Sequence, residues 1–130
     1  MEVSTHHAIV SRLCGEPVEV EVGRAKVRLE TCGDMVADAQ GLIHGGFIFG
    51  AADYAAMVAV NDPNVVLGAA EVRFVAPVRV LQIVDFEARV VTSKGKKHEV
   101  NVEGRVGNVT VFGGTFTCFV PDRYVLDKPE

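Results

Sequence analysis

Residues 41–60 read GLIHGGFIFGAADYAAMVAV, and the expected fold is built outward from this stretch. Its last fourteen residues, Phe47 to Val60, contain one charged side chain, Asp53. A helix without a polar stripe must be covered on every side, so this one belongs in a protein core. Fourteen residues with an acid in the middle are too short and too charged to span a membrane. We therefore expect a buried helix inside a soluble protein.

The segments that flank this helix alternate apolar and polar residues with a period of two, which indicates strands with one buried face. The alternation occupies residues 18–22 and 27–30 before the helix, and residues 70–74, 84–90, 100–106 and 109–120 after it. A curved sheet that wraps a single helix buries the apolar faces of both. The pattern therefore predicts an α+β domain with one long central helix inside an antiparallel sheet.

A few residues mark where the elements end or bend. Asn61 suits the C-terminus of the central helix and predicts its end there. Gly113-Gly114 within the last strand predicts a bulge or a close approach of another backbone. At the N-terminus the apolar spacing predicts a short amphipathic helix, with Ser4 or Thr5 as its cap and Gly15 as its end.

Length, charge and cysteine content limit the classes of function. The 130 residues have the size of one domain, residues 1–130. A net charge of −4 speaks against a nucleic-acid partner and gives no basic stripe for a membrane surface. Three widely spaced cysteines indicate reduced thiols and exclude a CxxC metal or redox motif. Because the N-terminus has no apolar signal region, we expect a cytoplasmic protein. The spacing of the cysteines leads us to expect no bound metal.

The charge of Asp53 needs an explanation, because burying an ion costs several kcal/mol unless the ion is paired or hydrogen-bonded. No Lys or Arg lies between Gly41 and Val60. Asp53 therefore either accepts hydrogen bonds from elsewhere in the fold or faces a cleft as a catalytic acid. The glycines upstream favour catalysis, since the free N–H groups of a helix start suit a polarised carbonyl or an oxyanion.

A second copy of the chain is implied if the helix start and the acid are both catalytic. Gly46 and Asp53 are seven residues apart, which is two helical turns and about 10 Å along the axis. An amide and an acid at this distance cannot act on the same carbonyl carbon. In a two-fold dimer with antiparallel helices, each site would take its acid from the other copy.

The residues around the helix start resemble those of a known family. Residues 38–46, DAQGLIHGG, with Asp53 nine positions after His44, are similar to the Asn-x-x-Gly-x-x-His-Gly-Gly pattern of hotdog-fold acyl-CoA thioesterases of the phenylacetate-pathway type. Residues 71–77, EVRFVAP, look like the strand that follows the helix in that family. The likeness runs from the first hairpin to Val120 and implies a single hotdog domain over residues 1–130.

The resemblance implies roles for the matching residues in the hydrolysis of an acyl-coenzyme A thioester. Asp53 of the neighbouring subunit would activate water as a base or attack the thioester as a nucleophile. The backbone N–H of Gly46, with Gly45 or Phe47 nearby, would polarise the carbonyl, and His44 would order the loop or touch the thioester. Coenzyme A would enter only as part of the substrate, with no other cofactor, and the protein would be a dimer or a dimer of dimers.

Several charged residues are candidates for contacts with the coenzyme A phosphates. They are Arg73 in the strand after the helix, and Lys94, Lys96 and Lys97 in a charged turn. A solvated turn is an equally good explanation for the lysines, because runs of charge are commonly wet surface.

Three positions depart from the family pattern. Asp38 replaces the usual Asn and puts a second acid near the site, where it could alter its role or raise the pKa of Asp53. Ala76 replaces an Arg that often precedes the proline. Glu71 replaces a frequent Ser or Thr, so water could be positioned differently. The choice of acyl group therefore stays open.

Three functions compete on the sequence alone. They are hydrolysis of an acyl-CoA, hydration or dehydration of an enoyl thioester, and non-catalytic binding of an acyl-CoA by a regulatory module. A hydratase would need His44 and Asp53 together, but nine residues of helix put them about half a rotation out of phase. A binding module would keep the glycine-rich helix start without needing Asp53. We favour the thioesterase.

Overall fold

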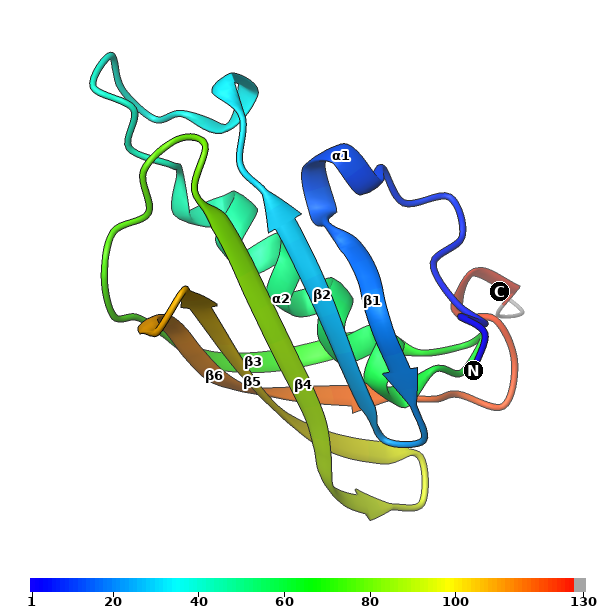
Figure 1. The fold of residues 1–130 in the computed structure, drawn as a ribbon. Coiled ribbons are helices and arrows are strands. Elements are labelled where there is room, and N and C mark those ends of the chain that lie inside the picture. The colour runs from blue at the N-terminus through cyan, green and yellow to red at the C-terminus, as the bar shows by residue number, and fades with distance from the viewer. Residues whose placement is uncertain (128–130) are drawn as a thin grey trace.

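The computed structural model describes residues 1–127 and contains a six-stranded antiparallel sheet around one long helix. The elements are α1 (Ser11–Cys14), β1 (Glu16–Glu21), β2 (Arg24–Glu30), η1 (Gly33–Met35), α2 (Gly45–Val60), β3 (Val66–Phe74), β4 (Ile83–Lys94), β5 (Lys97–Val106), β6 (Val109–Phe119) and η2 (Val125–Asp127). The strand order is β1-β2-β4-β5-β6-β3, so β1 and β3 form the two edges (Figure 1). The α+β architecture expected from the sequence is confirmed.

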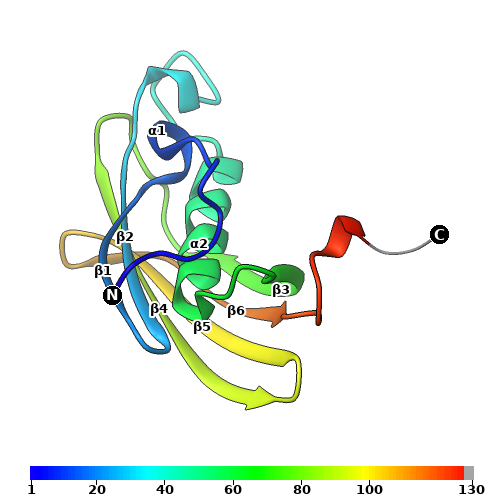
Figure 2. The ribbon, with the colours of Figure 1, turned by 90° about the vertical axis from the view of Figure 1, so that its right-hand side faces the viewer.

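The central helix α2 lies in the concave side of the curved sheet (Figure 2). It begins at Gly45, two residues before the apolar run, and ends where the sequence predicts. Asn61 adopts the left-handed conformation at its C-terminus, and the Asn61 N–H donates to the Met57 carbonyl at 2.8 Å. Within residues 1–127, no helix is long and apolar enough to cross a membrane.

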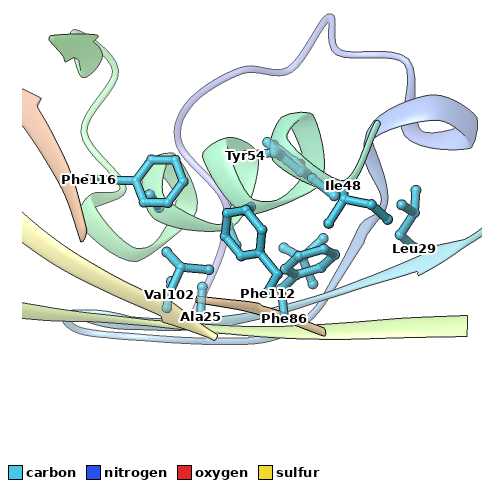
Figure 3. Packing of buried hydrophobic residues seen from close by; sticks show 14 of the residues in the cluster. Ala25, Leu29, Ile48, Tyr54, Phe86, Val102, Phe112 and Phe116 are labelled. Atoms are coloured by element: carbon cyan, nitrogen blue, oxygen red, sulfur yellow. The ribbon is translucent and has the colours of Figure 1, made fainter. Parts of the chain in front are cut away.

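Small residues on α2 let the sheet wrap closely around it, and aromatic side chains from the sheet fill the space between. Phe112 of β6 is fully buried and contacts Phe86 of β4 and Phe116 of the same strand, with ring centroids 6.1 Å and 6.3 Å away (Figure 3). Ala51 and Ala55 of α2 are fully buried as well. Burial of each large aromatic side chain contributes on the order of 2–3 kcal/mol, so this cluster fixes the helix on the sheet.

The expected N-terminal helix is much shorter in the structure. Only Ser11–Cys14 is helical, and its first turn follows Val10 without a side-chain cap, so the prediction of a cap at Ser4 or Thr5 is wrong. The reason is a tertiary contact, because Asn61 binds the backbone of Glu2 and Ser4, and residues 5–9 form bends and a turn in place of a helix. The Ser4 N–H donates to Asn61 Oδ1 at 2.7 Å, and Asn61 Nδ2 donates to the Glu2 carbonyl at 2.8 Å. The predicted end at Gly15 is confirmed.

Gly113 and Gly114 lie in β6 opposite β3, and they differ in their surroundings. A Cβ placed on Gly114 would lie 2.7 Å from the Glu71 carbonyl oxygen and 2.7 Å from Val72 Cγ1, so the predicted close backbone approach is confirmed there. A Cβ on Gly113 would meet nothing within 4 Å. The irregularity between β5 and β6 lies at Gly104/Arg105 instead, so the glycine pair is not a bulge in that ladder.

These two glycines give a matched test of the β3–β6 contact. We expect Gly114→Ala to lower the free energy of unfolding by about 1–3 kcal/mol, because the added methyl group must push β3 away. Gly113→Ala should change it by less than about 1 kcal/mol, since its methyl group meets open space. Urea unfolding followed by circular dichroism measures both. Equal losses from the two substitutions would contradict the assigned register.

Candidate active site

The start of α2 is held in place by the chain segments on both sides of it. The His44 N–H donates to the Met35 carbonyl at 2.9 Å, and the Ile43 N–H donates to the Val78 carbonyl at 2.9 Å. By contrast, the N–H groups of Gly45 and Gly46 have no acceptor within residues 1–127. They carry the partial positive charge of the helix start and are free to polarise an approaching oxygen.

His44 precedes the helix and lies over its first turn. Its ring makes an edge-to-face contact with Phe47, with centroids 6.2 Å apart and planes at 80°. A Cβ on Gly46 would lie 3.0 Å from His44 Nε2. The imidazole can therefore lie in this position because Gly46 has no side chain. The structure therefore brings together His44, Gly45, Gly46 and Phe47, as the sequence predicts.

Asp53 lies two turns further along α2 and is not satisfied within its own chain. Its Oδ1 is buried and has no hydrogen-bond partner among the described residues. Burial raises the pKa of Asp53 to about 6, and it is the one cause of this shift. Asp38 does not contribute, so the suggestion that a second acid raises this pKa is not needed.

Two cysteines share the surroundings of Asp53. Burial raises the pKa of the Cys118 thiol to about 12, and the charge of Asp53 adds to this effect. The pKa of Cys14 is raised by burial and then by Asp53 as well. Because a thiol is either neutral or negatively charged, these neighbours offer Asp53 no cation to pair with.

Gly46 and Asp53 share one side of an unbroken helix, but not one reaction centre. Seven residues of regular helix separate them by about 10 Å along the axis and by only about 20° around it. Gly50 lies between them, and a Cβ there would meet nothing within 4 Å. This side of α2, defined by Gly46, Gly50 and Asp53, is exposed at Gly46 and has room for a side chain at Gly50, whereas Oδ1 of Asp53 is buried.

Asp38 has a structural task in the loop before the helix. Its Oδ1 accepts hydrogen bonds from the Gln40 N–H at 2.9 Å and from the Leu42 N–H at 3.1 Å. An Asn side chain offers the same acceptor atom, so the replacement of Asn by Asp leaves this turn intact. Asp38 also lines a hollow of about 430 Å³ that includes Arg79.

Glu71 and Arg73 lie on β3, but the structure does not place them beside the helix start. Directly opposed residues of antiparallel strands point to the same face. Phe74 opposes the buried Phe112, whereas Glu71 opposes Thr115 and Arg73 opposes Gly113. Glu71 and Arg73 therefore point to the outer face of the sheet, away from α2 of their own chain.

The three lysines of the charged turn are also distant from the helix start of their own chain. The β4–β5 turn lies at the opposite end of the sheet from the start of α2 (Figure 1). Lys96 pairs with Asp122 at 2.9 Å and Lys97 with Glu99 at 3.7 Å, while Lys94 has no ion pair within residues 1–127. In one copy they form a solvated turn.

An apolar pocket beside Gly45 is a feature that the sequence analysis missed. It has a volume of about 300 Å³ and lies between the first turn of α2, residues 74–78 and Val111. Phe74 is 54% exposed at its edge. The sequence could have indicated this pocket, because Phe74 is a large apolar residue at the last position of β3.

The chain is similar to several known proteins. A model of the Thioesterase superfamily matches residues 40–113, which is more than half of the chain and includes the helix start, α2 and β3. The chain therefore belongs to the Thioesterase superfamily. A crystal structure of an uncharacterized protein from Pyrococcus horikoshii superposes with a TM-score of 0.96 at 46% identity, over 98% of each chain. The same fold, the hotdog fold, is thereby confirmed.

Two curated proteins and one more solved structure are also similar to this chain. The chain is 50% identical over 125 residues to a methylthioribose-1-phosphate isomerase of Aquifex aeolicus, covering 95% of this chain and 27% of that protein. It is 27% identical over 119 residues to the transcription factor FapR of Thermoanaerobacter sp., covering 91% and 60%. A variant of the phenylacetic acid degradation protein PaaI from Thermus thermophilus superposes with a TM-score of 0.77 at 25% identity, over 84% and 95%. The chain thus spans only part of these curated relatives.

The burial of Asp53 gives a testable effect on stability. Its pKa is higher in the folded chain, about 6, than its ordinary value of 3.8, so the folded state binds the proton more tightly. The stability due to this proton is complete below 3.8 and is lost as the pH rises through 6. We expect Asp53→Asn to raise the free energy of unfolding by about 1–3 kcal/mol at pH 8 and to have little effect at pH 4.

Glu30→Gln is the matched control, because Glu30 is exposed and forms no ion pair within residues 1–127. Urea unfolding at pH 4, 6 and 8 measures both variants against the wild type. A stability gain of Asp53→Asn that is the same at all three values would show that the carboxylate is not desolvated.

Proposed function

We propose that the protein hydrolyses an acyl-coenzyme A thioester to the free acid and coenzyme A. The observation that supports this most is the buried, unpartnered Oδ1 of Asp53, on the side of α2 that also begins with the free amides of Gly45 and Gly46. A carboxylate kept unpaired in apolar surroundings is costly, and catalysis by a base or nucleophile explains its presence. Membership of the Thioesterase superfamily supports the same reaction.

The catalytic step takes its two parts from two copies of the chain. The thioester oxygen lies at the amides of Gly45 and Gly46 of one copy, beside His44, and Asp53 comes from the other. Asp53 takes a proton from water, the resulting hydroxide adds to the carbonyl carbon, and the amides stabilise the oxyanion. The intermediate then collapses by breaking the C–S bond, and the coenzyme A thiolate leaves and is protonated. Direct attack by the Asp53 carboxylate, followed by hydrolysis of the mixed anhydride, uses the same geometry.

This arrangement requires a two-fold dimer, and we place its interface at β3. β3 is an edge strand whose residues 68–71 are exposed, so it can pair with a second β3 in an isologous contact. The same operation brings the sides of two α2 helices that carry the acid toward each other in antiparallel directions. Lys94, Lys96, Lys97 and Arg73 would reach coenzyme A only from the second copy. No cofactor other than the coenzyme A of the substrate takes part.

A second candidate is a regulatory module that binds an acyl-CoA without cleaving it. The similarity to the transcription factor FapR favours it, because 91% of this chain matches a part of that protein. Such a module has no use for the desolvated carboxylate of Asp53, so the enzyme is the better explanation. A hydratase is less well supported, because within one copy nine residues, about 13 Å along the helix axis, separate His44 from Asp53, so the two do not act together there. The finer assignment, a thioesterase of the PaaI type, is part of this proposal.

Subunit complementation tests both the reaction and the shared site. Asp53→Asn removes the acid, and Gly46→Val displaces the His44 ring and blocks the amides, so each variant alone should lose at least about 100-fold in kcat/KM. In mixed dimers, one site combines Gly46 of the first variant with Asp53 of the second. Mixing the unfolded variants and refolding them together should therefore restore about a quarter of the wild-type activity, from one intact site in half of the dimers.

Thiol release from acyl-CoA substrates measures the activity, and Glu30→Gln serves as the control. Because Glu30 is exposed on β2, outside α2 and the β3 edge, this variant separates a general loss of fold from loss of the acid. Full activity of Asp53→Asn would remove the acid from the reaction. The absence of recovery in co-refolded dimers, with each variant inactive alone, would place both groups in one copy.

The pH dependence of turnover gives an independent test of Asp53. Both mechanisms need the ionised carboxylate, and burial raises its pKa to about 6. We expect kcat/KM to fall about tenfold for each pH unit below 6 and to be constant above it, until other groups titrate. Initial rates of thiol release between pH 4.5 and 8 measure this profile. A flat profile down to pH 4.5 would contradict a role for a carboxylate with this pKa.

A further inference from the structure

The apolar pocket at the start of α2 has a composition that suits one kind of ligand group. Ten residues line its volume of about 300 Å³, and none of them has a polar side chain. Gly45, whose free N–H is part of the proposed oxyanion site, forms one of its walls. A group attached to a carbonyl carbon at these amides can therefore enter the pocket directly.

Phe74 forms one wall of the pocket and is held by contacts on two sides. Its ring packs edge-to-face on the buried Phe112, with centroids 5.4 Å apart and planes at 74°. Its Cε1 lies 3.3 Å from the place where a Cβ on Gly45 would be. The absence of a side chain on Gly45 thus lets the ring of Phe74 lie against the helix start, while 54% of Phe74 stays exposed.

The adjoining hollow, the one of about 430 Å³ described above, is lined by charged as well as apolar residues. It shares Leu42, Pro77 and Val78 with the apolar pocket, but it is also lined by Asp38 and Arg79. A ligand group with a carboxylate would find a cation only there. In the apolar pocket the same carboxylate would be buried without a partner, at a cost of several kcal/mol.

We infer that the apolar pocket binds the acyl group of the thioester, that this acyl group is uncharged and apolar, and that Phe74 limits its size. This inference rests on the proposed thioesterase function and adds the substrate class to it. The carbonyl lies at Gly45 and Gly46, the acyl chain extends past Phe74 into the pocket, and the coenzyme A leaves on the side of α2 where Asp53 of the second copy approaches.

Acyl-CoA pairs that differ in one property test the inference. Hexanoyl-CoA and adipoyl-CoA have acyl chains of the same length, but only adipoyl carries a terminal carboxylate. We expect kcat/KM for hexanoyl-CoA to be on the order of 100-fold higher. Phe74→Ala should shift the ratio of kcat/KM for decanoyl-CoA over butanoyl-CoA by on the order of tenfold toward the longer chain.

Phe119→Ala is the matched control, because Phe119 is 38% exposed and opposes Val66 at the other end of the β3–β6 ladder. It should leave both ratios unchanged. Ratios of two substrates on one variant cancel differences in the amount of folded protein. Size-exclusion chromatography of Phe74→Ala checks that the oligomeric state is the same as in the wild type.

A binding experiment separates failure of this inference from failure of the proposed reaction. Calorimetry with the Asp53→Asn variant measures the affinity of hexanoyl-CoA and adipoyl-CoA without turnover. If the wild type cleaves neither thioester but the hexanoyl preference exists in binding and depends on Phe74, the reaction is wrong and the pocket assignment holds. Equal use or binding of the two thioesters, a preference for adipoyl, or equal effects of the two Phe substitutions would overturn the assignment, as would binding of neither thioester.

Discussion

The desolvation of one carboxylate is the constraint on which the site depends. Asp53 is the only charged residue of α2, and its Oδ1 has no partner within residues 1–127. Keeping this buried carboxylate ionised costs on the order of 1–3 kcal/mol. That is a sizeable part of the roughly 5–15 kcal/mol by which a domain of this kind is stable. The fold accepts this cost at a single position of α2.

The rest of α2 explains how the fold tolerates such a residue. The buried sides of the helix carry small side chains, so the sheet approaches closely. The alanines are Ala51, Ala55 and Ala59, and the rings of Phe112 and Phe116 fill the space between helix and sheet. Burial on these sides outweighs the cost of one acid. Gly46, Gly50 and Asp53 lie on another side of the same helix, so the packing of the domain and the candidate site use different faces of α2.

The sequence predicts the elements of this fold because their patterns are local. Period-two alternation identifies the strands, and Asn61 marks the end of α2 through its own backbone preference. The form of residues 1–10 was beyond prediction, because Asn61 reaches across 57 positions to bind Ser4. The outward direction of Glu71 depends on the register between β3 and β6, which no local pattern contains. The pocket behind Phe74 forms only when residues 74–78 fold over the start of α2.

Asp38 shows how the loop before the helix links these features. Its carboxylate binds the N–H groups of Gln40 and Leu42, and an exposed carboxylate that accepts two backbone hydrogen bonds is inexpensive. The loop held in this way carries Leu42 into the walls of both hollows, the apolar pocket and the one lined by Arg79. The replacement of Asn by Asp therefore keeps the geometry of the helix start and adds a negative charge to the polar hollow alone. Asp38 and Arg79 line the same hollow, so the negative charge of Asp38 makes this hollow less favourable for a carboxylate than Arg79 alone would.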